Sequence, residues 1–284
     1  MDGRLMMMTS RSVPRTLGKT SGGERSQARA LLDTDSGKVL RERMPLSLLK
    51  EAAQSKILPV QLRRELALAI WVRSVLLDDD ATAWELIPVL QDLTPELKQD
   101  LDAYLGAKNH AARKFAAAFV ILKFPGMRPS MNTGVGRLTP LNRIDNYPDN
   151  WWCSVSLEAK HNTTFGNFYR TQYWISDPLR TLYPDGEVKF PEFLGKAQKL
   201  AATSEWEQLG ALGTAPSYLS QQGIAWARRH PEDPRAPEAL HLAVKSTRYG
   251  CIDKETSTFS KHAFHLLHKR YPNSPWAAKT KYWY

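Results

Sequence analysis

The chain has 284 residues, of which 42% are hydrophobic and 24% are charged, the balance of an ordinary soluble globular protein. It contains no run of about 18 apolar residues, and this argues against a transmembrane helix. Lys and Arg outnumber Asp and Glu by 39 to 29. Acids are interspersed among these bases along the chain, and aromatic residues do not alternate with them, so the composition argues against nucleic acid as a partner.

The chain begins with a polar segment. Residues 1–43 are rich in Gly and Ser and contain nine Lys or Arg and five Asp or Glu. Such a composition buries too little apolar surface to fold, so we predict a disordered basic tail here. The segment lacks the apolar stretch of a secretory signal, which predicts a cytoplasmic protein. The alternative is that the sequence is the C-terminal part of a longer chain with an export signal, and the protein is then periplasmic or in the cell envelope.

A helical bundle is predicted over residues 44–124. Pro45 and Pro59 stand at first-turn positions, where the missing N–H of proline costs nothing, and apolar residues recur after each at three- and four-residue spacing. The run of three aspartates at 78–80 ends one helix and caps the next. A last helix is predicted over about 111–123. The short turns between these helices indicate that neighbours pack antiparallel.

Residues 125–189 predict a long irregular segment rich in aromatic residues, and segments of this kind are often functional. Its most function-like stretch joins an acid and an amide to paired indoles, at Asp149, Asn150, Trp151 and Trp152. We predict these four as binding residues, with the indoles stacking on a sugar or a peptide. A second alternative pairs Asp149 with Glu158 as acid and base in glycoside hydrolysis. In a third alternative, the indoles of Trp151 and Trp152 are buried and only pack in the core.

Two further sets of residues invite chemical interpretations. The only cysteines, Cys153 and Cys251, form no Cys-x-x-Cys pair, so they are either two buried thiols or one disulfide, which requires an oxidising compartment. His262, His265 and His268 sweep about 120° around a helix, which is too wide for one metal ion without further ligands. We predict no metal and no other cofactor. The chain also lacks the Gly-x-Ser-x-Gly elbow and the phosphate-binding glycine loop, and we predict no catalytic residues.

Residues 190–284 predict a helical repeat. The segment 228–236, RRHPEDPRA, recurs 41 residues later as 269–277, KRYPNSPWA, with both prolines aligned. Such a period punctuated by proline is typical of stacked helical hairpins. The basic residues favour the negative end of a helix, and proline prevents its continuation. The same ending occurs in Lys123-Phe124-Pro125 and, more weakly, in Leu182-Tyr183-Pro184. Large aromatic side chains are expected to fill the gaps between alanine-rich helix faces: Trp226, Tyr249, Trp276 and Trp283.

The second copy of this repeat, residues 269–277, resembles the inter-repeat turn of bacterial tetratricopeptide-like (TPR-like) proteins, in which a helix ends in Tyr-Pro-x-Ser and the next begins with a small residue. The resemblance is limited to residues 219–284. The period of 41 residues exceeds the usual length of about 34, and the Trp-Leu-Gly pattern of standard repeats is absent. The resemblance implies an α-solenoid whose concave surface binds a peptide or a protein.

We therefore expect an all-α protein of antiparallel helical hairpins, interrupted by the irregular segment. A non-catalytic role is favoured over an enzymatic one: a scaffold or adaptor that holds a protein or peptide partner in a groove between its two helical parts. Arg248 and Tyr249 are predicted as further contacts. The alternatives are a glycan-binding or glycan-cleaving protein of the bacterial cell envelope, and a C-terminal accessory part of a longer enzyme.

Overall fold

The computed structural model describes residues 32–131, 141–146, 151–152, 188–248 and 252–284. Within these ranges every regular element is a helix, which confirms the all-α prediction. The helices are, in chain order, α2 (Thr34–Arg43), α3 (Leu46–Gln54), α4 (Val60–Leu76), α5 (Asp80–Leu93), the 3₁₀-helix η2 (Pro95–Leu97), α6 (Lys98–Leu105), α7 (His110–Lys123), α10 (Lys196–Ala211), α11 (Ala215–Arg229), α12 (Ala236–Ser246), α13 (Thr256–Arg270) and α14 (Pro275–Lys279). None of them combines the length and the apolarity that a membrane span requires.

Ordered structure begins earlier than the sequence pattern predicts. Asp33 caps α2 by accepting a hydrogen bond from the backbone N–H of Ser36 at 2.8 Å. Leu32 and Leu40 are buried in the main core. The predicted disordered tail of residues 1–43 is therefore wrong for its last twelve residues, 32–43, while residues 1–31 lie outside the described part of the chain. The prediction failed because it used the average composition of residues 1–43. That average does not reflect the capped helix at the end of the segment, with its two buried leucines.

The N-terminal helices pack around α4. All its residues from Leu66 to Leu76 are buried, so this helix is covered on every side rather than along one stripe. Trp71 of α4 meets Tyr104 of α6 edge to face, with ring centroids 5.4 Å apart. The predicted cap at 78–80 is Asp79, whose side chain accepts from the N–H of Thr82 at 3.0 Å. These contacts define a bundle of neighbouring helices with a dense apolar centre.

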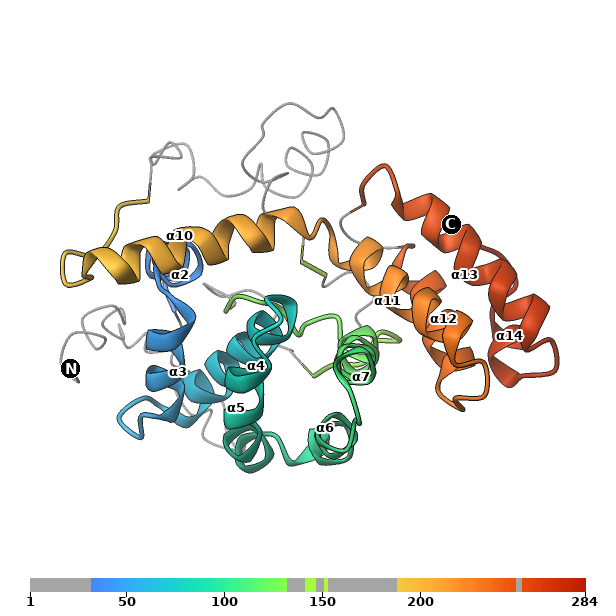
Figure 1. Cartoon of the computed structure of the whole chain (residues 1–284), viewed down its shortest axis with the longest axis horizontal. Coiled ribbons are helices and arrows are strands. Elements are labelled where there is room, and N and C mark those ends of the chain that lie inside the picture. The colour runs from blue at the N-terminus through green and yellow to red at the C-terminus, as the bar shows by residue number, and fades with distance from the viewer. Residues whose placement is uncertain (1–31, 132–140, 147–150, 153–187, 249–251) are drawn as a thin grey trace, which may run out of the picture.

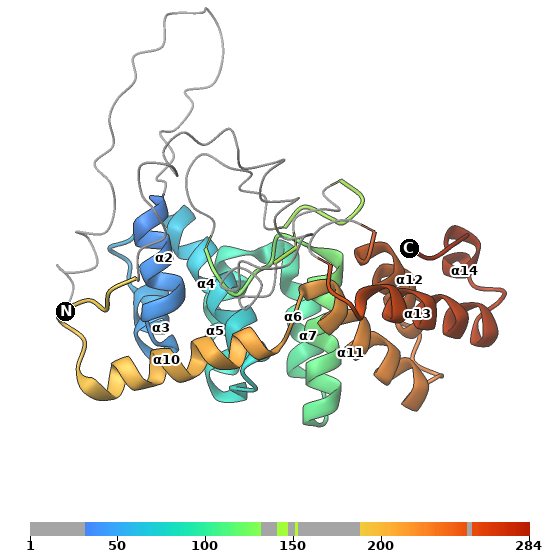
Figure 2. The same cartoon turned by 90° about the horizontal axis from the view of Figure 1, so that it is seen from above.

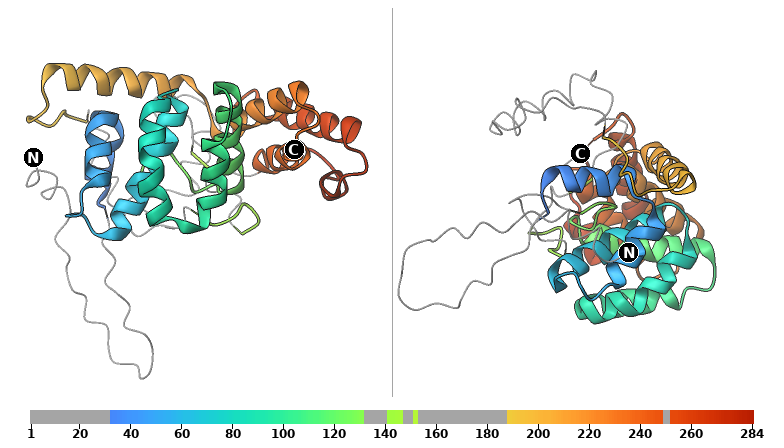
Figure 3. Two further views of the ribbon diagram at one scale, coloured as in Figure 1. Left: turned by 60° about the horizontal axis from the view of Figure 1, so that its bottom comes forward. Right: turned by 90° about the vertical axis from the view of Figure 1, so that its left-hand side faces the viewer.

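The bundle and the C-terminal hairpins share one core. Figure 1 shows α2–α7 at one end of the molecule and α11–α14 at the other, with α10 running along one side of the bundle. The other views show the same course of α10 past α2 and α3 (Figures 2 and 3). Phe115 of α7 stacks on Trp226 of α11, with centroids 4.7 Å apart and planes at 6°. Leu209, Tyr218 and Leu242 belong to the same apolar cluster as the bundle.

The repeat predicted from the sequence corresponds to two equivalent helices. Both ends of α13 lie 41 residues after the corresponding ends of α11. A second apolar cluster, which includes Ile224, Leu240, Ala263 and Leu267, joins α11, α12 and α13. The second hairpin is shorter than the first, because α14 has 5 residues and α12 has 11. The structure therefore supports neighbouring helices packed as repeated hairpins.

Three helices end through the same local device. The C-cap residues of α7, α11 and α13 each precede a proline and have φ values of −128°, −130° and −129°. Proline disfavours the helical conformation of the residue before it, so the helix ends there. In each case the C-cap carbonyl then accepts from the N–H three residues later: Met127 to Phe124 at 2.9 Å, Asp233 to His230 at 3.1 Å, and Ser274 to Tyr271 at 3.0 Å.

Candidate functional site

The paired indoles of the predicted binding platform belong to the core. Trp151 is 2% exposed and Trp152 is 8% exposed, and both lie in the apolar cluster of the bundle. The carbonyl of Trp152 accepts a hydrogen bond from the backbone N–H of Ala215, the first residue of α11, at 3.2 Å. Side chains so deeply buried offer no stacking face to a sugar or a peptide, so the core-packing alternative fits these two residues. Their predicted role as a platform is wrong.

The remaining residues of that prediction divide into two groups. Asp149, Asn150 and Tyr249 lie outside the described residues, as do Glu158 and both cysteines of the sequence. Arg248 follows α12 and is exposed. Its guanidinium lies 4.9 Å from the ring centroid of Tyr284 and donates to the phenol oxygen of that residue at 2.9 Å. Arg248 is exposed, and the neighbours that the structure gives it are among the last residues of the sequence; its role as a contact for a partner stays a prediction.

The final five residues, Thr280–Tyr284, are non-helical and lie along α13. At one end, Nε2 of His268 lies 2.7 Å from the carbonyl oxygen of Thr280. At the other end, the N–H of Tyr284 donates to Oγ of Ser260 at 3.1 Å. These contacts fix the direction of the segment, which runs antiparallel to α13. Two side chains of α13 thus hold this stretch by its backbone, one at a carbonyl and one at an N–H.

Aromatic side chains of this segment form an exposed cluster with α13. Trp283 packs against Phe264 and His265 with centroid distances of 4.9 Å and 5.2 Å. Tyr282 meets Tyr284 edge to face at 83°. Tyr282 is 53% exposed and Trp283 is 42% exposed, so the expectation that Trp283 fills a gap in the core is wrong. We call Lys261, His265, Lys281, Tyr282 and Trp283 the C-terminal aromatic surface.

All charged side chains from the start of α13 to the end of the sequence are basic. From Thr256 to Tyr284 the sequence contains five Lys or Arg and three His, and no Asp or Glu. The pKa of the exposed Tyr282 phenol is lowered, first by its hydrogen bond with Tyr284 and then by the positive charge of Arg248. Burial raises the pKa of Tyr284. A positive potential of this kind attracts anionic groups.

Two carboxylates on elements next to α13 are engaged within the protein, whereas Glu255, the N-cap residue of α13, is exposed. Asp253 accepts hydrogen bonds from the hydroxyls of Thr214 and Ser217, both at 2.8 Å, and from that of Thr256 at 3.0 Å. Asp145 forms an ion pair with Lys245 of α12. These carboxylates therefore already have donors or a cationic partner.

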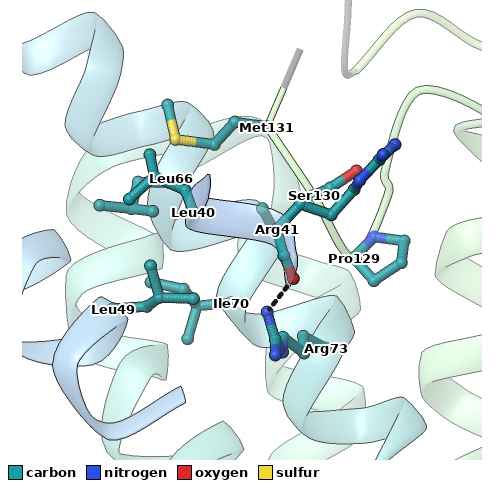
Figure 4. A pocket seen from close by; sticks show the side chains of 10 residues that line it. Leu40, Arg41, Leu49, Leu66, Ile70, Arg73, Pro129, Ser130 and Met131 are labelled. Atoms are coloured by element: carbon teal, nitrogen blue, oxygen red, sulfur yellow. Dashed lines mark hydrogen bonds between the residues drawn. The ribbon is translucent and has the colours of Figure 1, made fainter. Parts of the chain in front are cut away.

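A small pocket lies at the other end of the molecule, between α2, α3, α4 and residues 129–131 (Figure 4). Its volume of about 260 Å³, which includes solvent at its mouth, is below the roughly 300–1,000 Å³ of ordinary ligand sites. The one cation buried at its edge, Arg73, donates to the carbonyl oxygen of Arg41 at 3.1 Å, as Figure 4 shows. This pocket is therefore part of the packing between α2, α3 and α4, and we assign no ligand to it.

The three histidines of α13 have separate environments. His262 and His265 are exposed, whereas His268 contacts the Thr280 carbonyl. Among the described residues, no group of three or more His, Cys, Asp or Glu has a geometry that could hold a metal ion. Comparisons of the chain with protein-family models, with curated proteins and with solved structures find no match. The candidate site thus rests on the geometry of α12, α13 and the last five residues.

Proposed function

We propose that this protein is a non-catalytic scaffold or adaptor of TPR-like type that binds a protein or peptide partner on its C-terminal hairpins. One observation carries the proposal: side chains of α13 hold the extended segment Thr280–Tyr284 by its backbone, at the Thr280 carbonyl and the Tyr284 N–H. Recognition of both backbone donor and acceptor groups is how proteins bind extended peptides irrespective of sequence. The hairpins thus already pack against one non-helical segment through its backbone, and we place the partner on the outer surface that this segment completes.

The architecture supports this role. Stacked helical hairpins form extended surfaces that bind other chains, and the equivalence of α11 and α13 gives this protein two such units in succession. The bundle and the hairpins pack directly through Phe115 and Trp226. We therefore assign the binding surface to the outer faces of the hairpins, rather than to a groove between the two helical parts.

The glycan-binding and glycan-cleaving alternatives have weaker support. They need exposed indoles beside Asp149, and both Trp151 and Trp152 are buried. No second function is proposed.

Site-specific photo-crosslinking in extracts of the native host tests the adaptor role. A photoreactive residue is placed at exposed Gln221 of α11 or exposed His262 of α13, and at exposed Gln99 of α6 as the matched control. We expect one reproducible protein to crosslink from the hairpin positions, and the same protein in purified form to bind with defined stoichiometry by calorimetry. Equal crosslinking from position 99, or no protein that binds after purification, would overturn the proposal.

A further inference from the structure

We infer that the C-terminal aromatic surface recognises an acidic segment of the partner protein, an inference that rests on the proposed function and specifies its ligand. The surface has two kinds of group that meet such a segment. Lys261 and Lys281 are exposed, and no carboxylate partner is found for either among the described residues. Tyr282 and Trp283, which follow Lys281 in the sequence, expose 53% and 42% of their surface.

Charge complementarity selects an anionic ligand. The 29 residues from Thr256 onward carry no Asp or Glu. Of the acids on neighbouring elements, Asp145 pairs with Lys245 and Asp253 accepts from the hydroxyls of Thr214 and Ser217, and exposed Glu255 stands before the first turn of α13. An incoming carboxylate therefore meets cations without a competing acid on the same helix. Such uncompensated charge acts mainly by steering association, and its effect falls as salt rises.

The arrangement of the rings favours a peptide over a nucleic acid. Successive bases of a single strand need a row of open aromatic faces. Here Trp283 already packs against Phe264 and His265, at interplanar angles of 53° and 46°, and Tyr282 meets Tyr284 edge to face. Both rings are therefore partly covered by neighbouring rings, and neither stands as an open stacking face in a row. An indole and a phenol combine apolar ring carbons with one polar group, which suits a peptide that carries both carboxylates and apolar side chains.

The direct test is fluorescence anisotropy of the full chain with a fluorescein-labelled peptide in which glutamates alternate with glycine around one central phenylalanine. The controls are the same peptide with glutamine in place of glutamate, and a single-stranded oligonucleotide of equal charge. At low ionic strength we expect the acidic peptide to bind and the glutamine peptide to bind at least about tenfold more weakly. Binding should weaken further between low and physiological salt.

Matched variants locate the binding. The double variant Lys261→Glu/Lys281→Glu should weaken the acidic peptide about tenfold, and Trp283→Ala should weaken it several-fold. The control is Lys56→Glu/Lys108→Glu, which makes the same change in net charge at exposed positions of the N-terminal bundle. Circular dichroism melting of all variants checks that each remains folded. The control variant should bind like the unmodified chain.

Three outcomes would overturn the inference: equal loss of binding in the control variant, equal binding of the glutamine peptide, or tighter binding of the oligonucleotide through Lys261 and Lys281. The inference and the adaptor role fail separately. If the crosslinked partner binds the Lys261→Glu/Lys281→Glu variant with full affinity, the adaptor role stands and the acidic ligand is wrong. If no partner is found from either hairpin position, the adaptor role itself fails.

Discussion

The carboxylate of Glu205 on α10 accepts a hydrogen bond from Nη2 of Arg73 on α4 at 2.8 Å, across 132 residues of sequence. The Arg73 side chain is 1% exposed and that of Glu205 is 17% exposed. The same carboxylate accepts from the N–H of Leu46, the first residue of α3, with both oxygens at 3.0 Å. Glu205 thus joins three helices. This contact matters because Ala202 and Leu209 are the only buried residues of α10.

Removal of this carboxylate should destabilise the protein strongly. Glu205→Ala leaves the Arg73 guanidinium buried without a counter-ion, and such a loss costs about 3–5 kcal/mol. Chemical denaturation with urea gives the free energy of unfolding. The matched control is Asp102→Ala, which removes the exposed pair with Lys98 and should leave the free energy of unfolding almost unchanged, because exposed ion pairs contribute little. Equal effects of the two substitutions would show that Glu205 does not fasten α10 to the bundle.

The ring stack between α7 and α11 should carry much of the coupling between the two helical parts. Phe115 is 2% exposed and lies against Trp226, so Phe115→Ala should cost about 3–5 kcal/mol through lost burial and the cavity left behind. We expect thermal unfolding to become less cooperative as well. Trp84→Ala serves as the control, because this indole is 45% exposed. A similar loss of stability in both variants would contradict the shared core.

Asp253 should make stability depend on pH in the acidic range. Burial alone raises the pKa of this carboxyl, but hydrogen bonds from Ser217, Thr214 and Thr256 outweigh burial, and the pKa is lowered. A group with a lowered pKa stabilises the fold above its unfolded pKa of about 3.9, and this contribution is lost as pH falls through the folded value.

The substitution Asp253→Asn should therefore cost about 2 kcal/mol at neutral pH, because hydrogen bonds to a charged acceptor are lost. The cost should shrink as the pH falls below about 4, where the unmodified side chain also becomes neutral. Urea denaturation of both proteins across this range measures the difference. A cost that stays constant with pH would mean that the charge of Asp253 is not what stabilises the turn.

His241 should destabilise the protein at mildly acidic pH. Burial, followed by the nearby charge of Lys245, lowers its pKa to about 4, although Asp145 acts in the opposite direction. Its Nδ1 lies 2.7 Å from Oγ1 of Thr280. The imidazole is neutral in the fold but takes up a proton below about pH 6.5 when the chain is unfolded, so stability is lost as the pH falls from 6.5 towards 4.

The substitution His241→Gln removes this titration while keeping a polar side chain of similar reach. We expect the unmodified protein to lose about 1–2 kcal/mol more than the variant between pH 7 and pH 4.5, after allowance for solvent screening of a partly exposed group. NMR titration of the His241 ring protons measures the pKa directly. A ring that titrates near pH 6.5 in the folded protein would rule out this source of acid sensitivity.

The sequence by itself determined the helical class and the ends of the repeated helices. Phe124, His230 and Tyr271 all end helices because each precedes a proline and each carbonyl bonds three residues ahead. These interactions involve only residues close together in the sequence, so the helix ends can be predicted from the local sequence. The offset of 41 residues likewise located α13 relative to α11.

Tertiary structure alone decided which side chains are accessible. Trp151 and Trp152 are buried and Trp283 is exposed, although the three are chemically identical and all stand in aromatic stretches. The bond between Arg73 and Glu205 joins residues with no shared local pattern. Burial and pairing of this kind depend on contacts between helices that are far apart in the sequence. The local propensity of a segment does not specify which other segment will pack against it.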